Sequence, residues 1–340
     1  MVFSRRSSQR RRNGRVFREG RRAAAFAALD LGTNNCRLLV AEAVRDGFKV
    51  VDAFSRIVRL GEGLNRTGRL SEAAMGRALD ALKVCAGKIR RRPRVQVRGV
   101  ATEACRKADN CTDFMERIRG ETGLSFEIIS PEEEARLAMG GCLPLLNDSR
   151  PRALVFDIGG GSTQVMWLDL SRAEPELLAS LSIPAGVISV SEAYDRAPLS
   201  RAQYEDLIDG VGVHLEPFCE EFGIRREIQA GAVQMLGTSG TVTTLAGLQL
   251  GLPRYDRSRV DGVYLHLDAV RSLSDDLRSL SYTERAARPC VGSDRADLVV
   301  AGCAILEALC DRWPVDRLRV ADRGVREGIL VDLMGRPNGA

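Results

Sequence analysis

The sequence predicts an α/β protein of two duplicated domains that face each other across a central cleft. Two segments carry this prediction, because each is an apolar strand that ends in Asp and continues into glycine and small polar residues: 27–35 and 155–163. Glycine lets backbone N–H groups converge on an oxyanion with no side chain in the way. The chain of 340 residues also has room for two domains of about 150 residues each. Such paired loops are expected to hold one phosphate chain from both sides.

The first predicted domain is rich in strands. Strand-like segments are expected at 26–30, 36–44, 48–60, 95–102 and 125–130. Helices are expected at 71–91 and 112–121, and the first has apolar residues at helical spacing: Met75, Leu79, Leu82, Cys85 and Ile89. Three strands followed by helix, strand, helix and strand fit one half of an actin-like (ribonuclease H-like) fold better than a Rossmann unit.

The second predicted domain repeats this theme. Its strand-like segments are 153–157, 164–170, 178–183, 187–190, 232–237 and 317–320. One helical stretch is expected at about 201–222. Helices are also expected to dominate from 241 to 334, interrupted by the strand at 317–320. The predicted division is therefore a disordered tail at 1–25, domain I at 26–130 and domain II at 131–323, with a helix at about 324–336 that packs back onto domain I.

Charge is distributed unevenly along the chain. Residues 1–25 hold nine Arg and one acid, so the remainder has 41 basic and 44 acidic residues and a net charge of −3. A polar, Arg-rich tail of this kind is expected to be disordered. It could serve as a solubilising extension, an arm that tethers polyanions or a transit peptide. The folded part is not a basic nucleic-acid-binding surface, so any contact with nucleic acid is expected to be weak and to involve the tail.

Cysteine, histidine and hydropathy exclude several protein classes. Nine cysteines without a C-x-x-C spacing indicate reduced thiols in a cytoplasmic protein rather than a disulfide framework. The only histidines are His214 and His266, which argues against a zinc site or a Ser-His-Asp triad. No apolar run approaches the roughly 20 residues of a membrane span, so no membrane partner is expected.

Residues 130–137 have the pattern of a helix start with one spare carboxylate. Ser130 is the expected N-cap, Pro131 takes the first helical position, and Glu133 falls where it completes a capping box. Capping accounts for Glu132 and Glu133 but does not need Glu134. Glu134 is therefore a candidate general base.

Other segments contain candidate anion and cation ligands. Arg106 lies among small residues at 99–110 and offers a bidentate fork for phosphate oxygens, although a solvated Arg-Lys pair is the alternative. Residues 237–244 lead from a strand into a helix whose N-terminus could bind an anion or simply form a tight turn. Asp30 and Asp157 could cap turns, but their matched positions favour a shared role beside a hard cation. The P-loop and dinucleotide-binding glycine patterns are absent.

Together these motifs resemble the Ppx/GppA family of exopolyphosphatases and guanosine pentaphosphate phosphohydrolases, within the actin-like ATPase superfamily. The resemblance covers about residues 26–335 in order. It rests on the segments 28–34, 101–110, 128–137, 157–163 and 237–241, and later segments at 295–298 and 326–330 also fit.

The resemblance implies a hydrolase of phosphoanhydrides that uses Mg²⁺ to release terminal phosphate from polyphosphate or from pppGpp. Glu134 matches the proposed catalytic base, Asp157 the acidic residue near the metal, and Arg106 an arginine that guides phosphate. Asp30 is the second metal candidate. With the third small-residue loop included, the expected phosphate-binding residues are Asp30, Gly32, Thr33, Asn34, Gly159, Gly160, Gly161, Ser162, Gly237, Ser239 and Gly240.

Gln164 departs from the family pattern, which usually has Glu at this position. A neutral amide can accept a hydrogen bond from metal-bound water but supplies no charge, so weaker cation affinity or turnover is expected. This departure keeps a second interpretation open, a non-catalytic sensor that binds polyphosphate, ppGpp or pppGpp in the same cleft. A sugar or acetate kinase is a third, because residues 30–33 also resemble the phosphate loop of such kinases. A homodimer is a further expectation.

Overall fold

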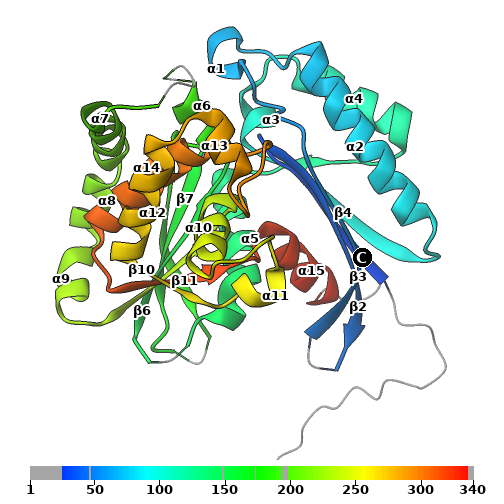
Figure 1. Ribbon diagram of the computed structural model, residues 1–340. Coiled ribbons are helices and arrows are strands. Elements are labelled where there is room, and N and C mark those ends of the chain that lie inside the picture. The colour runs from blue at the N-terminus through cyan, green and yellow to red at the C-terminus, as the bar shows by residue number, and fades with distance from the viewer. Residues whose placement is uncertain are drawn as a thin grey trace, which may run out of the picture.

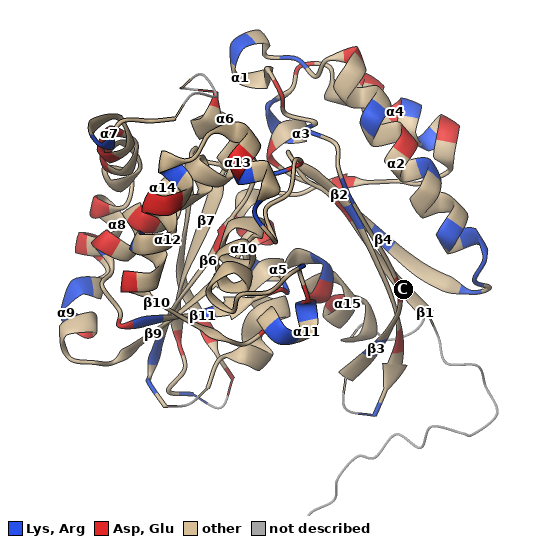
Figure 2. Cartoon of the chain, in the orientation of Figure 1, with Lys and Arg blue, Asp and Glu red and all other residues tan. Residues whose placement is uncertain are grey.

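Two mixed β-sheets face each other in the computed structural model, with helices on their outer faces and between them (Figure 1). The structure describes residues 25–45, 47–147, 149–172, 174–192, 194 and 198–335. The predicted tail at 1–25 lies outside the described residues except for Ala25, which begins the first strand. Acidic and basic residues are interspersed over the helices of both lobes (Figure 2).

The first sheet has the strand order β3-β2-β1-β4-β5. Its strands are β1 (Ala25–Leu31), β2 (Asn35–Val44), β3 (Gly47–Ile57), β4 (Val95–Ala101) and β5 (Glu127–Ile128). The first three form an antiparallel meander, whereas β4 and β5 run parallel to β1. Its helices are α1 (Leu64–Thr67), α2 (Glu72–Arg90), α3 (Glu103–Lys107) and α4 (Cys111–Thr122). The predicted apolar face of α2 is buried against this sheet.

The second sheet has the order β10-β11-β9-β6-β7-β8. Its strands are β6 (Arg152–Ile158), β7 (Thr163–Asp169), β8 (Glu176–Ile183), β9 (Val233–Thr238), β10 (Tyr264–His266) and β11 (Arg317–Ala321). Read from β8, the order β8-β7-β6-β9-β11 repeats β3-β2-β1-β4-β5 with the same strand directions. This repetition confirms the predicted duplicated α/β architecture. The short strand β10 extends the second sheet and was not predicted.

Helices of the second half are α6 (Val187–Ser191), α7 (Arg201–Gly212), α8 (Glu216–Glu221), α9 (Ile224–Gln229), α10 (Gly240–Gln249), α11 (Arg257–Val260), α12 (Leu267–Ser279), α13 (Tyr282–Ala287) and α14 (Val299–Arg312). The strand predicted at 187–190 is wrong, because this segment forms α6. The amides of Val187 and Ile188 donate to the carbonyls of Gly159 and Gly160, which draws the segment onto the second glycine loop instead of onto a strand.

Two helices lie between the sheets, α5 (Pro131–Cys142) and α15 (Val325–Gly335), with a short 3₁₀ turn at Leu143–Leu145 after α5 (Figure 1). The C-terminal helix α15 packs against α5 and against β1 and β2. One apolar cluster contains side chains from both helices and from the facing sides of both sheets. The two helices therefore connect the halves of the molecule beneath the cleft.

The α5–α15 contact requires glycine on both helices. A Cβ atom added at Gly328 would lie 1.9 Å from the Leu137 carbonyl oxygen, and one added at Gly141 would lie 2.1 Å from the Gly324 carbonyl oxygen. Both clashes are with backbone atoms, so a side-chain rotation cannot relieve them. The helices meet backbone to backbone.

Replacing Gly328 with Ala is therefore expected to separate α5 from α15 and to lower the free energy of unfolding by about 1–3 kcal/mol, the usual cost of overpacking. Urea denaturation measures this change. Gly87→Ala is the matched control, because Gly87 lies inside α2 with nothing within 4 Å of an added Cβ. That substitution is expected to stabilise by about 1 kcal/mol. Equal stability of the wild type and Gly328→Ala would contradict the close contact.

Candidate functional site

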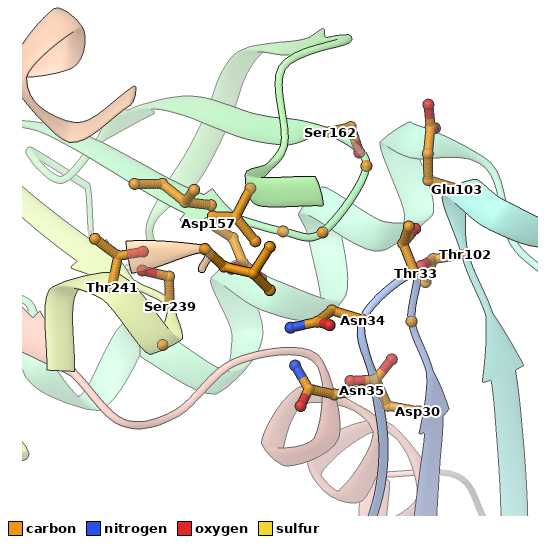
Figure 3. A pocket seen from close by; sticks show the side chains of 18 of the residues that line it. Asp30, Thr33, Asn34, Asn35, Thr102, Glu103, Asp157, Ser162, Ser239 and Thr241 are labelled. Carbon is orange, nitrogen blue, oxygen red and sulfur yellow. The ribbon is translucent and has the colours of Figure 1, made fainter. Parts of the chain in front are cut away.

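The loops that follow β1 and β6 meet across the cleft. A Cβ atom added at Gly160 would lie 2.8 Å from the backbone nitrogen of Asn34, and one added at Gly161 would lie 3.0 Å from Thr33 Oγ1. These glycines therefore allow the two loops to touch. A cavity with about 940 Å³ of empty space, part of it open to solvent, lies beside this contact (Figure 3).

Most of the predicted site residues line this cavity. They are Asp30, Gly32, Thr33, Asn34, Glu134, Asp157, Gly159, Gly160, Gly161, Ser162, Ser239 and Gly240. The structure thus brings together side chains and loops from both sheets and from the starts of α5 and α10. Arg106, Gln164 and Gly237 were also predicted here but do not line the cavity.

Four residues with carboxylates line the cavity: Asp30, Asp157, Glu134 and Glu103. Asp30 and Asp157 occupy equivalent places near the ends of β1 and β6. Burial raises the pKa of Asp157 to about 7, although the charge of Arg37 opposes this shift and that of Asp30 adds to it. Burial also raises the pKa of Asp30, against the charge of Arg37. The two aspartates therefore form a site of strong negative potential that a cation would relieve.

Glu134 lies in the first turn of α5, where Ser130 caps the helix by accepting a hydrogen bond from the Glu133 amide. Burial raises the pKa of Glu134 to about 7, opposed by the positive charge of Arg106. Glu134 Oε2 lies 2.9 Å from Arg106 Nη1. This contact is an ion pair whose geometry is not that of a regular hydrogen bond, and among the described residues no other group bonds to this buried oxygen. It remains able to accept a proton or a hydrogen bond from water.

The predicted capping box is only half formed. Ser130 accepts from the Glu133 amide as expected, but the Glu133 carboxylate pairs with Arg136 and with Arg98 at 2.7 and 2.9 Å. These two guanidinium groups compete successfully with the Ser130 amide for the carboxylate. They lower the pKa of Glu133 to about 2, Arg136 more than Arg98.

Arg106 does not line the cavity but contacts Glu134, which does. Its Nη1 atom donates to the Ile129 carbonyl at 2.8 Å, and its Nη2 atom donates to Glu103 Oε2 at 3.0 Å. The side chain is 15% exposed, so it is not the solvated surface arginine considered as an alternative. Its charge therefore lies beside Glu134, whereas the sequence predicted that Arg106 would contact phosphate directly.

Gln164 and Gly237 serve the surrounding structure. Gln164 is buried on β7, and its Nε2 atom donates to Ser162 Oγ at 3.2 Å and to Ser182 Oγ at 2.9 Å. A Cβ atom added at Gly237 would lie 2.5 Å from the ring of Phe156. Gln164 thus supports the second glycine loop, and Gly237 makes room for an aromatic ring.

Several lining residues were not predicted, and two of them are arginines. Arg37 on β2 stands opposite Asp30 in the β1–β2 ladder, and Arg295 donates to Thr244 Oγ1 at 3.0 Å. Burial lowers the pKa of Arg295, and the nearby charge of Arg37 lowers it further. Arg37 could have been found from the sequence, because a hairpin that begins at Asp30 places it next to that carboxylate.

The starts of three helices also face the cavity. Glu134 comes from the first turn of α5, Gly240 begins α10, and Val325 begins α15. Backbone N–H groups at helix starts carry partial positive charge and bind anions. Together with the glycine loops they make the cavity suited to a phosphate group despite its carboxylates.

The carboxylate pKa values predict how stability depends on pH in the metal-free protein. Because the folded protein binds more protons than the unfolded chain between about pH 4.5 and 7, the free energy of unfolding should fall as pH rises through this window. Urea unfolding with EDTA at pH 5 and pH 8 measures the difference. Glu133 adds almost the same stability at both pH values, because its folded-state pKa of about 2 and its ordinary pKa of 4.5 both lie below pH 5. Higher stability at pH 8 than at pH 5 would contradict the burial of Glu134 and Asp157.

The described residues contain no group of three or more His, Cys, Asp or Glu side chains that could hold a metal ion. Within the same part of the chain, no helix combines the length and apolar character needed to cross a bilayer.

Comparison with known proteins finds a clear set of relatives. The family model described as the Ppx/GppA phosphatase family matches residues 39–337. An exopolyphosphatase 2 of Mycobacterium tuberculosis is 30% identical, and the match covers 91% of this chain and 98% of that protein. A guanosine-5'-triphosphate,3'-diphosphate pyrophosphatase of Aeromonas salmonicida is 29% identical over 91% of this chain. The chain spans only 59% of the length of this second relative.

Solved structures show the same fold. A crystal structure of an exopolyphosphatase from Cytophaga hutchinsonii matches with a TM-score of 0.82 and 25% identity, covering 93% of this chain and 100% of that chain. The Ppx/GppA family member of Aquifex aeolicus matches with a TM-score of 0.74 and 27% identity, covering 94% of this chain and 100% of that chain.

Proposed function

The chain belongs to the Ppx/GppA phosphatase family, and we propose that it is a phosphohydrolase that releases the terminal phosphate of polyphosphate or of pppGpp. The observation that carries this proposal is the Glu134 carboxylate, which lines the cavity with its Oε2 atom 2.9 Å from the Arg106 guanidinium. It belongs to a cavity lined by two glycine loops and the starts of three helices. The cavity thus combines anion-binding groups with a carboxylate that can accept a proton.

The residues present fit Mg²⁺ as the cofactor. Mg²⁺ usually binds one or two carboxylates and completes its shell with water and substrate phosphate oxygens, so a cage of three acidic side chains is not needed. Asp30 and Asp157 would hold the ion, because both line the cavity and burial, with a smaller addition from the Asp30 charge, raises the pKa of Asp157. When bound, the ion would neutralise charge on the phosphates.

In the proposed reaction, backbone N–H groups of the two glycine loops hold the oxygens of the terminal phosphate. Arg37 and Arg295 supply positive charge from the cavity wall. Glu134 orients a water molecule and takes its proton as the water attacks phosphorus in line with the leaving oxygen. Such reactions depend mainly on positioning and electrostatic stabilisation, and this cavity offers groups for both.

The two alternative interpretations have less support. The sensor interpretation depends on Gln164, whose side chain supports Ser162 instead of lining the cavity. Its neutral amide therefore does not remove a charge from the cavity wall. A kinase would transfer phosphate to an acceptor, whereas the relatives of this chain are named as an exopolyphosphatase and a pyrophosphatase. We therefore favour hydrolysis.

Phosphate release from polyphosphate and from pppGpp, measured side by side with and without Mg²⁺, tests this proposal. We expect release that requires Mg²⁺ and stops when EDTA is added. Binding of either compound without phosphate release would instead support the sensor. Turnover of ATP that depends on an added acceptor would support the kinase.

A further inference from the structure

Four charged side chains form a continuous line from the surface to Glu134. Lys107 Nζ lies 2.6 Å from Glu103 Oε1, and Glu103 Oε2 lies 3.0 Å from Arg106 Nη2. Arg106 Nη1 in turn lies 2.9 Å from Glu134 Oε2. Three of the four residues belong to the single short helix α3, whereas Glu134 belongs to α5. A contact at one end of this line can therefore affect Glu134.

Glu103 also contacts the opposite half of the molecule. Its side chain is 12% exposed, and its Cγ atom lies where a Cβ atom at Gly161 would be only 2.8 Å away. The carboxylate points away from Asp30 and Asp157 (Figure 3). Glu103 therefore packs against the second glycine loop while its charge is directed toward Arg106 and Lys107 rather than toward the phosphate-binding wall.

We propose that Glu103 is a positioning residue that holds the Arg106 guanidinium in the one orientation that leaves Glu134 free to act as a base. This inference rests on the proposed function. In the observed orientation Nη2 is held by Glu103 and Nη1 donates to the Ile129 carbonyl. Arg106 therefore contacts Glu134 through Nη1 alone and does not form a two-bond fork with its carboxylate.

Loss of the Glu103 charge would release Nη2. A guanidinium forms its most favourable contact with a carboxylate through two parallel hydrogen bonds. The freed Arg106 is therefore expected to turn its fork onto both oxygens of Glu134, which leaves neither oxygen free to orient water. Glu103 also lines the cavity, but its carboxylate faces Arg106 and Lys107, so substrate binding should change little.

The test is Glu103→Gln, which keeps the shape of the side chain and removes its charge. We expect kcat for phosphate release to fall about 10–100-fold, the size of effect that a small misplacement of a catalytic group can have. KM should stay within about threefold of the wild-type value. Glu121→Gln is the matched control, because Glu121 pairs in the same way with one Lys and one Arg, at 2.7 and 2.8 Å, on the surface of α4. It should leave both constants unchanged.

A double-mutant cycle with Glu134→Gln separates positioning from a general structural effect. If Glu103 acts through Glu134, adding Glu103→Gln to Glu134→Gln should lower kcat by less than about twofold further. Fully multiplicative effects, or a raised KM with unchanged kcat, would overturn the inference.

The outcomes also distinguish this inference from the proposed function. An inactive Glu134→Gln protein together with a fully active Glu103→Gln protein would overturn the positioning role and leave the hydrolase intact. A fully active Glu134→Gln protein would remove the base itself, and both proposals would fall.

Discussion

Replacing Glu134 with Gln is expected to lower kcat for phosphate release by about 10²–10⁴-fold while the protein stays folded. Gln has the same shape but cannot take a proton from water. The wild-type rate should also rise with pH through about 7, because burial raises the pKa of Glu134 to about 7 and only the deprotonated form is a base. Steady-state phosphate release between pH 6 and 9 measures both effects.

Glu132→Gln is the matched control for this prediction. Glu132 lies in the same helical turn but is exposed, outside the cavity. Its replacement should leave kcat unchanged. Thermal melts of both variants would show whether the fold is retained. A Glu134→Gln protein that is well folded and as active as the wild type would contradict the role of Glu134 as the base.

Sequence patterns predicted the repeated part of the fold, because it depends on local signals that occur twice. Each half begins with an apolar strand, an Asp and a glycine loop, and each forms the same meander in the structure. Segments whose partners are distant in sequence were predicted less well. The apolar run at 187–190 has strand propensity, but hydrogen bonds to the Gly159 and Gly160 carbonyls determine its helical form.

The same distinction holds for the candidate site. Glu134 was found because local helix-capping rules leave it without a structural role, and it does line the cavity. Arg295 was missed as a cavity residue because it approaches Thr244 only through tertiary packing. Arg106 was chosen for its chemistry, but its partners come from α3, from Ile129 and from α5. Those partners determine where its charge acts.

Asp157→Asn is expected to raise the stability of the metal-free protein and to lower its activity. In the metal-free protein at pH 8 it should raise the free energy of unfolding by about 2–4 kcal/mol, because the folded-state pKa of about 7 means that ionisation of this buried carboxylate opposes folding. Turnover should fall, and the Mg²⁺ concentration for half-maximal activity should rise by at least about 10–100-fold. Urea unfolding with EDTA and a Mg²⁺ titration of phosphate release measure the two effects.

Asp169→Asn is the control with the opposite expectation for stability. Asp169 lies at the end of β7, where Ser171 and, to a smaller extent, Arg152 lower its pKa to about 2. Its charge therefore contributes to stability at pH 8, and its removal should destabilise the protein without changing the Mg²⁺ requirement. A Mg²⁺ requirement unchanged by Asp157→Asn would exclude this aspartate as a metal ligand. If Asp157→Asn were less stable than the wild type at pH 8, the Asp157 charge would already have a partner in the folded protein. Higher stability together with a raised Mg²⁺ requirement is the combination expected of an aspartate that binds the ion.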